Sequence, residues 1–210
     1  MAFNHVFWVD QAVPHGCWLG RLSGFEKGYQ IRNGVPRAEG WPSDVSLEMS
    51  KDFRKYTLTP DCVNSINAAT IISERVVEFL REKELPNVEY LPVTILNHKG
   101  KAVDTPYFIL HPVHLVDCLD VDACQTTFGL MSKKNYEKIG SFVPDESKCD
   151  DLPPIMRIAG LSFHVAVHRD LAREIDDAGF TGIGWYEPSD LVGKHLVQAL
   201  PGFSADEAPE

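Results

Sequence analysis

Two distant segments of the chain share one pattern, and this repeat constrains the fold more than any other feature of the sequence. SERVVEFLREKELPNVEYLP (73–92) and HRDLAREIDDAGFTGIGWYEP (168–188) each combine an amphipathic helix, a short turn and an aromatic strand that ends in proline. Leu80 corresponds to Ile175 in this comparison. If the repeat is structural, both helices pack on one sheet with these two side chains buried in equivalent places. Chance similarity between two common helix–strand units is the alternative.

Boundary signals define both helices and most of the strands. The first helix is predicted over residues 73–85, where Ser73 is a good N-cap, and the second over residues 168–180, where Gly179 suits the C′ position. Aromatic and β-branched runs between glycine, proline and asparagine predict strands at residues 3–9, 28–35, 87–96, 105–112, 135–143, 154–167 and 182–188. A turn at 97–100 joins two of them as a hairpin. The predicted fold class is α+β: a mixed, mainly antiparallel sheet with two or three packed amphipathic helices.

The length of 210 residues suits one substantial domain. No abrupt change of composition and no low-complexity linker divides the chain. We therefore expect a single domain over residues 1–200, with a β-rich N-terminal part at residues 1–50. Residues 201–210 form a polar, acidic tail that is expected to fray.

A net charge of −10 and a pI of about 5.2 limit the classes of partner. Phosphate backbones and anionic membranes attract clustered lysine and arginine, so we expect neither as the partner. An acidic surface instead suits a basic protein. The N-terminus lacks a secretion-signal pattern, no apolar run approaches a membrane span, and the five cysteines form no CxxC pair. These features favour a reduced, cytoplasmic protein.

The stretch HPVHLVDCLDVDAC (111–124) gathers residue types that bind metals or move protons. Pro112 opposes a helix around His111, and in a strand His111 and His114 point to opposite faces, which makes a poor zinc site. A calcium loop needs a glycine at its sixth position, and the run DVDACQ that begins at Asp120 has none. We therefore expect no bound metal and no cofactor.

Motifs for catalysis are weak. The sequence contains neither a GxSxG elbow nor a GxxxxGK[ST] phosphate loop, and the GIG at 182–184 precedes a strand rather than a helix. Cys118 or Cys124 beside a histidine could form a thiolate pair, but cysteines of a reduced protein are more often small core residues. Trp185 and Tyr186 are neighbours on a strand, so one of them faces away from the core. That ring is either part of a binding surface or an edge aromatic covered by the C-terminal segment.

Three stretches carry hydrophobic patterns with a few polar anchors. They are YFILHPVHLVDCLDVDAC (107–124), LPPIMRIAGLSFHVAVHRDLAREIDDAGFTGIGWYEPSDL (152–191) and, more weakly, TIISERVVEFLREKEL (70–85). This combination, over about residues 55–190, resembles a family of bacterial immunity proteins, the immunity protein eleven group, which accompany polymorphic toxins. The resemblance implies that residues 111–124 form a strand-to-helix corner whose turn is fixed by Asp117 and Asp120.

The resemblance implies a non-enzymatic, cytoplasmic immunity protein that binds and neutralises a cognate protein toxin, as a monomer or a homodimer. The alternative is a small hydrolase or transferase that uses His111 or His114 with a nearby aspartate or cysteine. A third reading is an adaptor or chaperone for a secreted effector. Charge and the outward aromatic ring favour one partner-binding surface. Its expected residues are Asp120, Asp122, Trp185, Glu187 and Asp190.

Overall fold

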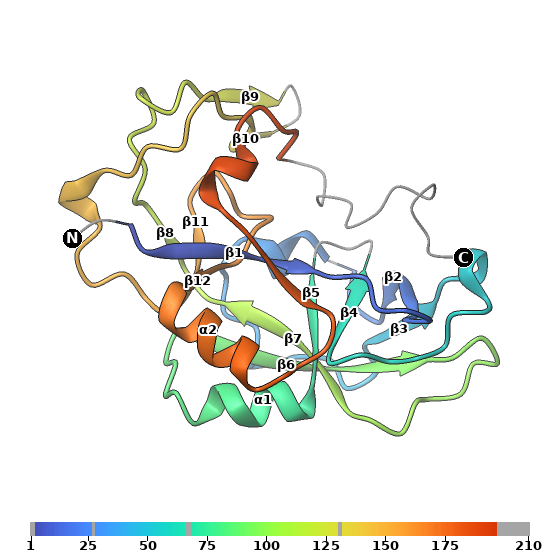
Figure 1. The fold of residues 1–210 in the computed structure, drawn as a ribbon. Coiled ribbons are helices and arrows are strands. Elements are labelled where there is room, and N and C mark those ends of the chain that lie inside the picture. The colour runs from blue at the N-terminus through green and yellow to red at the C-terminus, as the bar shows by residue number, and fades with distance from the viewer. Residues whose placement is uncertain (1–2, 27, 66–68, 130–131, 197–210) are drawn as a thin grey trace.

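The computed structural model describes residues 3–26, 28–65, 69–129 and 132–196. In these ranges the chain forms a five-stranded sheet, a closed barrel and a small two-stranded sheet (Figure 1). The two-stranded sheet pairs β9 (Thr127–Gly129) with β10 (Ser132–Lys138). Short 3-10 helices connect the strands: η1 (Gly28–Arg32), η2 (Lys51–Phe53), η3 (Glu146–Lys148) and η4 (Pro188–Leu191).

The five-stranded sheet brings both ends of the chain together. Its order is β13-β1-β12-β11-β8. The bounds in that order are Ile183–Tyr186, His5–Asp10, Ala166–His168, Ile155–Ile158 and Leu115–Val116. β1 is antiparallel to both β12 and β13, while β11 is antiparallel to β12 and parallel to β8. The N-terminal strand therefore lies inside a sheet built mainly from C-terminal segments.

The barrel follows the order β2-β3-β6-β7-β5-β4 and closes where β4 pairs with β2. The bounds in that order are Trp18–Ser23, Ser46–Met49, Val88–Leu96, Tyr107–Pro112, Thr70–Ser73 and Cys62–Ser65. β6 and β7 form the predicted hairpin, and the Asn97 side chain accepts hydrogen bonds from the backbone N–H groups of Lys99 and Lys101 in its turn. Closure leaves these strands without open edges, so their backbone groups are paired on both sides.

The predicted α+β fold class is wrong, because the protein is mostly β. α1 spans Glu74–Arg81 and α2 spans Arg169–Asp177, and the described ranges contain no third α-helix. Several strands are short and buried on both faces, so their sequences predict them weakly. All four residues of β5 and all four of β11 are buried. Such strands show no alternation of apolar and polar residues. No helix in the described ranges has the length and apolar character needed to span a membrane.

Two predicted strands also require correction. Residues 28–35 are not a strand: they begin as η1, and the Ile31 side chain of this helix packs in the barrel core. The run at 154–167 forms two strands, β11 and β12, rather than one. The chain turns between them at Gly160, whose φ is 83° and whose Cα approaches the Tyr136 ring so closely that a Cβ would lie 2.2 Å from it. Only glycine fits such a position.

The two helix–strand units have the same topology. β5 and β6 flank β7 and are connected by α1, while β12 and β13 flank β1 and are connected by α2. Leu80 and Ile175 are 0% and 1% exposed and belong to the same core cluster, which confirms their equivalent burial. The expectation of a single sheet is wrong, since α1 packs on strands of the barrel and α2 on strands of the five-stranded sheet.

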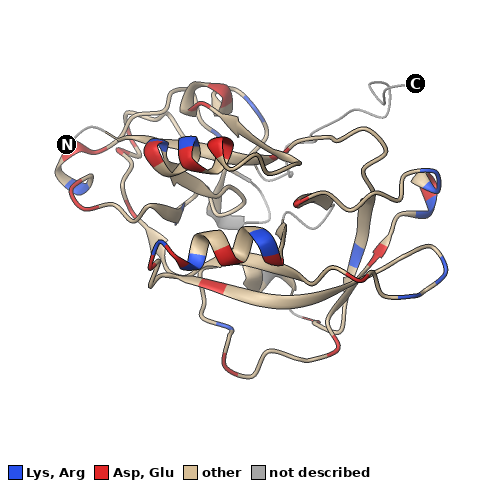
Figure 2. Ribbon diagram, turned by 60° about the horizontal axis from the view of Figure 1, so that its bottom comes forward, with Lys and Arg blue, Asp and Glu red and all other residues tan. Residues whose placement is uncertain are grey.

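The two helices run in opposite directions and are bridged by side chains (Figure 1). Arg75 at the start of α1 donates to the carbonyl oxygen of Ala178 just beyond α2 and lies over the Phe180 ring. Lys83, beyond the other end of α1, forms an ion pair with Glu174. The helices thus join the barrel to the sheet, and Figure 2 shows charged residues of both signs along both of them.

Three core clusters are found among the described residues, and strand alternation separates them. On β1, Val6 and Trp8 face the helices, whereas Phe7 faces the opposite layer. On β5, Ile72 faces the helices and Ile71 points into the barrel. The five-stranded sheet is therefore covered on both faces, and its second face supports the loops that contain most of the predicted site residues.

Candidate functional site

Trp185 lies on β13 at the edge of the five-stranded sheet and is half-buried. Its indole N–H donates to Asp176 of α2 at 2.8 Å, and its ring meets Trp8 edge-to-face at a centroid distance of 5.4 Å. These contacts hold the ring against the core between sheet and helices. Only part of the ring is available to a partner, so Trp185 combines a structural role with a restricted contact surface.

Glu187 and Asp190 follow β13 and shape the start of η4. The Glu187 carboxylate pairs through both oxygens with the guanidinium of Arg169, and this pairing lowers the pKa of Glu187. The Asp190 carboxylate accepts the backbone N–H of Glu187 at 2.8 Å, as part of a capping box. Both carboxylates are exposed, but each already serves the local structure.

Asp120 and Asp122 lie in the turns that follow β8. The Asp120 side chain accepts the backbone N–H of Ala123 at 3.0 Å. Asp117 instead forms an ion pair with Lys148 at 3.1 Å, and the segment continues as turns, so the strand-to-helix corner is wrong in its second half. Asp120 and Asp122 are exposed, and neither forms an ion pair with any described residue.

The structure places the five predicted residues in two groups. Trp185 lies on one edge strand of the five-stranded sheet, β13, and Glu187 and Asp190 follow it. Asp120 and Asp122 follow the other edge strand, β8. Both connecting segments nevertheless pack on the same face of the sheet (Figure 1), where Leu119 and Leu191 share one core cluster. The arrangement is two acidic patches on one layer rather than a single ring of carboxylates.

His111 and His114 are separated as the sequence predicts. His111 is fully buried in β7, its Nε2 lies 2.8 Å from the carbonyl oxygen of Val35, and burial lowers its pKa. His114 is exposed and has a φ of 64°. Within the described ranges no three histidine, cysteine, aspartate or glutamate side chains gather as a set of metal ligands.

The cysteines of the same stretch are poor nucleophiles. Burial raises the pKa of the Cys118 thiol to about 12 and also raises that of Cys124. The Cys124 sulfur accepts the backbone N–H of Val143. A reactive cysteine needs its thiolate, which a raised pKa disfavours. The geometry around His111 and these two cysteines therefore supports core packing better than catalysis.

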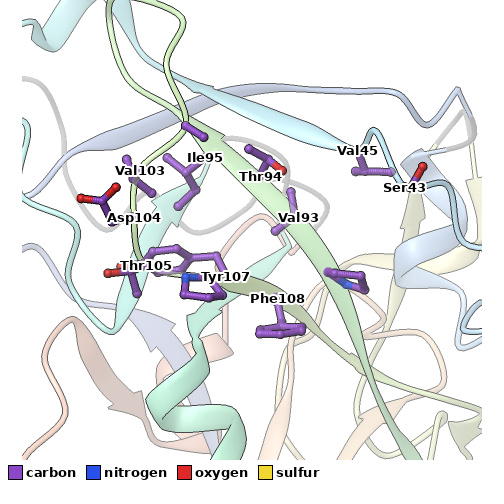
Figure 3. Close-up of a pocket in the computed structure, with 13 residues that line it drawn as sticks. Ser43, Val45, Val93, Thr94, Ile95, Val103, Asp104, Thr105, Tyr107 and Phe108 are labelled. Atoms are coloured by element: carbon purple, nitrogen blue, oxygen red, sulfur yellow. The ribbon is translucent and has the colours of Figure 1, made fainter.

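A groove of about 290 Å³ lies beside the β6–β7 hairpin (Figure 3). Val93, Ile95, Val103 and Phe108 contribute to its apolar walls. Apart from the Tyr107 phenol, Asp104 is the one ionisable side chain among the described residues that line it. Its size is at the lower limit of ligand pockets, and its lining offers little to orient a reacting group.

A family model described as "Immunity protein family (Imm11)" matches residues 10–190. The chain belongs to this immunity protein family. The Imm11 match begins at residue 10, whereas the resemblance seen in the sequence begins near residue 55. The match therefore also includes β2 and β3. A comparison with curated proteins finds no match.

Sequence reasoning did not single out two charged residues of this Imm11 protein. Asp61 joins the barrel to α1 and to the turn before β13, and Arg157 is fully buried in β11. Arg157 could have been noticed because it interrupts the apolar run PIMRIAGL. Asp61 has no comparable signal, since the partners of its carboxylate lie 12, 14 and 120 residues away in the sequence.

A third ionisable group, Asp10, predicts a pH dependence of stability. Asp10 accepts a hydrogen bond from the Cys62 thiol at 3.3 Å, and the surrounding protein raises its pKa from 3.8 to about 7 by desolvation, although part of its surface stays accessible. The folded state thus holds this proton more tightly than the unfolded chain. The stability that this group contributes is fully present below about pH 4 and is lost as the pH rises to about 7.

The Asp10→Asn variant is expected not to lose this stability as the pH rises. The free energy of unfolding of the wild type minus that of the variant should decrease between pH 5 and pH 7 and level off above about pH 7. Urea unfolding of both proteins across this range measures the difference. If the free energy of unfolding of the two proteins depends on pH in the same way, the Asp10 carboxyl has the same pKa in the folded and the unfolded state, which contradicts the prediction.

Proposed function

We propose that this Imm11 protein acts in the cytoplasm by binding and neutralising a cognate toxin. The family match over residues 10–190 carries this proposal. Immunity proteins of this kind generally have no enzymatic activity, so a binding surface rather than a catalytic centre is the feature to seek. A net charge of −10 disfavours a nucleic acid or an anionic membrane as the partner.

The acidic surface supports a basic region on the toxin as the target. Toxins that act on nucleic acids or nucleotides need positive charge in their clefts, because their substrates are anionic. An acidic protein can fill such a cleft as a substrate mimic or cover it, and its field speeds the encounter. Fast association is useful because the toxin must be bound before it acts.

Of the two acidic patches, the one at Asp120 and Asp122 is the stronger candidate. No described cation pairs with these carboxylates, whereas Arg169 neutralises Glu187. Trp185 beside the second patch supplies an aromatic contact of the kind that dominates binding energy, within the limits of its partial exposure. We propose that the Asp120 patch steers the encounter and that Trp185, Glu187 and Asp190 contribute to the final contact.

Co-expression with any toxin-like protein that is found to be encoded beside this gene tests the function. Cells should survive the toxin only when the immunity protein is present, and the purified pair should form a 1:1 or a 2:2 complex whose association slows at high salt. Size-exclusion chromatography with light scattering distinguishes the two stoichiometries. Absence of both binding and protection for every adjacent toxin candidate would overturn the proposal.

Neutralising the first patch tests the proposed surface separately. Asp120→Asn with Asp122→Asn should lower the association rate roughly 2- to 10-fold at low salt and have a smaller effect at high salt. Glu26→Gln with Glu39→Gln is the matched control, because it removes the same charge from two exposed residues elsewhere. Stopped-flow or biosensor kinetics measures the rates. Equal rates for the two double variants would contradict the surface while leaving the function intact.

The enzyme alternative receives little support from the geometry. His111 is enclosed in the barrel wall and bonded to a backbone carbonyl, while His114 lies outside on a turn. The nearby thiols of Cys118 and Cys124 are buried with raised pKa values. A hydrolase or transferase would need at least one of these groups in an accessible and activated state.

A further inference from the structure

Arg157 is a fully buried cation with most of its hydrogen-bonding capacity unused. Its Nη1 donates to the carbonyl oxygen of Ser162 at 2.7 Å, which fixes the guanidinium plane. Its Nε and Nη2 have no hydrogen-bond partner among the described residues. These two nitrogens form one side of the guanidinium fork, the edge that binds both oxygens of a carboxylate or a phosphate.

The loop that holds Arg157 is itself fixed. Ser162, between β11 and β12, donates through its hydroxyl to Asn135 of β10 at 2.6 Å. The carbonyl oxygen of Gly160 accepts the backbone N–H of Tyr136 at 2.8 Å. The free edge of the guanidinium is therefore held in one orientation rather than being free to search for a partner.

A second arginine and two histidines surround this cation. Arg32 of η1 is half-buried and stacks on the Phe163 ring, with its Cζ 4.3 Å from the ring centroid. Burial, together with the charge of Arg32, lowers the pKa of Arg157 to about 10. Burial and the charge of Arg157 lower the pKa of His164 to about 4. Burial and the same charge also lower the pKa of His111. His164 Nε2 is buried and has no hydrogen-bond partner among the described residues.

No carboxylate of the described residues compensates this charge. Neither Arg157 nor Arg32 forms an ion pair with any described residue, and no acidic group contributes to the pKa shift of either. Burying an unpaired charge costs several kcal/mol, so proteins normally provide a counter-ion or use the site to bind one. The concentration of positive charge and unused donors at one place is thus typical of an anion site.

We propose that Arg157 and Arg32 form a binding site for a small oxyanion, a carboxylate or phosphate group, between the five-stranded sheet and η1. The side of the Arg157 fork formed by Nε and Nη2 binds two oxygens of the ligand, and half-exposed Arg32 closes the site on its outer side. The site is independent of toxin binding and lies on other elements than the two acidic patches.

Thermal unfolding in different anions tests this site. The full chain is heated in sodium chloride, sodium phosphate and sodium acetate at equal ionic strength, and phosphate binding is measured separately by calorimetry. We expect phosphate or acetate, but not chloride, to raise the Tm with a response that saturates. The anion that gives the larger shift identifies which oxyanion the site takes.

Variants separate the site from a general salt effect. Arg157→Lys should abolish the saturable response because it removes the fork, and Arg157→Met should abolish it while leaving the Tm in chloride unchanged or higher. Arg32→Gln should weaken the apparent affinity roughly tenfold through loss of one charged partner. Arg54→Gln, at an exposed arginine, is the control and should behave as the wild type.

Two results would overturn the site. One is a non-saturating rise in Tm that is the same in the wild type and all variants, since phosphate stabilises many proteins by exclusion from their surfaces. The other is an equal response to chloride and to both oxyanions. If Arg157→Met does not fold, Arg157→Lys and Arg32→Gln still decide between these outcomes.

Discussion

Replacing Leu80 by alanine is expected to lower the free energy of unfolding by about 2–5 kcal/mol. Leu80 is fully buried where α1, the barrel and the five-stranded sheet meet, so its truncation leaves a cavity that three different elements border. Urea unfolding followed by tryptophan fluorescence measures the loss. Ile175→Ala, at the equivalent position of α2, should cost a similar amount.

The control for this prediction is Leu58→Ala. Leu58 has 51% of its surface exposed, so the same chemical change should shift the free energy of unfolding by less than about 0.5 kcal/mol. A cost below about 1 kcal/mol for both Leu80→Ala and Ile175→Ala would contradict the tight packing of the two helices between barrel and sheet.

Removing the Asp61 carboxylate should be almost as costly, at about 2–4 kcal/mol. The two oxygens of Asp61 accept hydrogen bonds from the Ser73 hydroxyl, the Arg75 guanidinium, and the backbone N–H and hydroxyl of Thr181, at 2.9 to 3.2 Å. Asp61→Ala leaves several of these donors without an acceptor. The effect is expected in equilibrium unfolding and in faster amide exchange at the backbone N–H of Thr181.

Two variants sharpen the test of Asp61. Asp61→Asn retains one acceptor oxygen and should lose less stability than Asp61→Ala. Asp104→Ala removes an exposed aspartate and should shift the free energy of unfolding by less than about 0.5 kcal/mol. Equal stability of Asp61→Ala and Asp104→Ala would mean that the four hydrogen bonds add nothing to the connection between barrel and sheet.

Local sequence was sufficient for the features that depend on neighbouring residues. The apolar spacing of α1 and α2 predicted their place and the burial of Leu80 and Ile175, because a helical face is defined within a few turns. The β6–β7 hairpin followed from its turn residues for the same reason. The family resemblance also rested on such short patterns.

Contacts between distant segments set the limit of this reasoning. Ser73 was predicted to cap α1, and it does occupy the N-cap position, but its hydroxyl donates to Asp61 instead of accepting from the helix. The five predicted site residues form two groups, because β8 and β13 lie at opposite edges of the sheet. The hydrogen-bond partner of Ser73 and the placement of the site residues depend on residues that are distant in the sequence.

The sequence by itself determined the helices, the hairpin, the family and the acidic character of this protein. Only the tertiary structure decided that the fold is mostly β, that β1 pairs with two strands from the C-terminal part of the chain, and that six strands close into a barrel. It also decided that Arg157 is buried without an ion-pair partner among the described residues. The physical reason is that strand pairing and the burial of a charge depend on packing and hydrogen bonds between distant segments. The hydrophobic periodicity of a single segment does not contain this information.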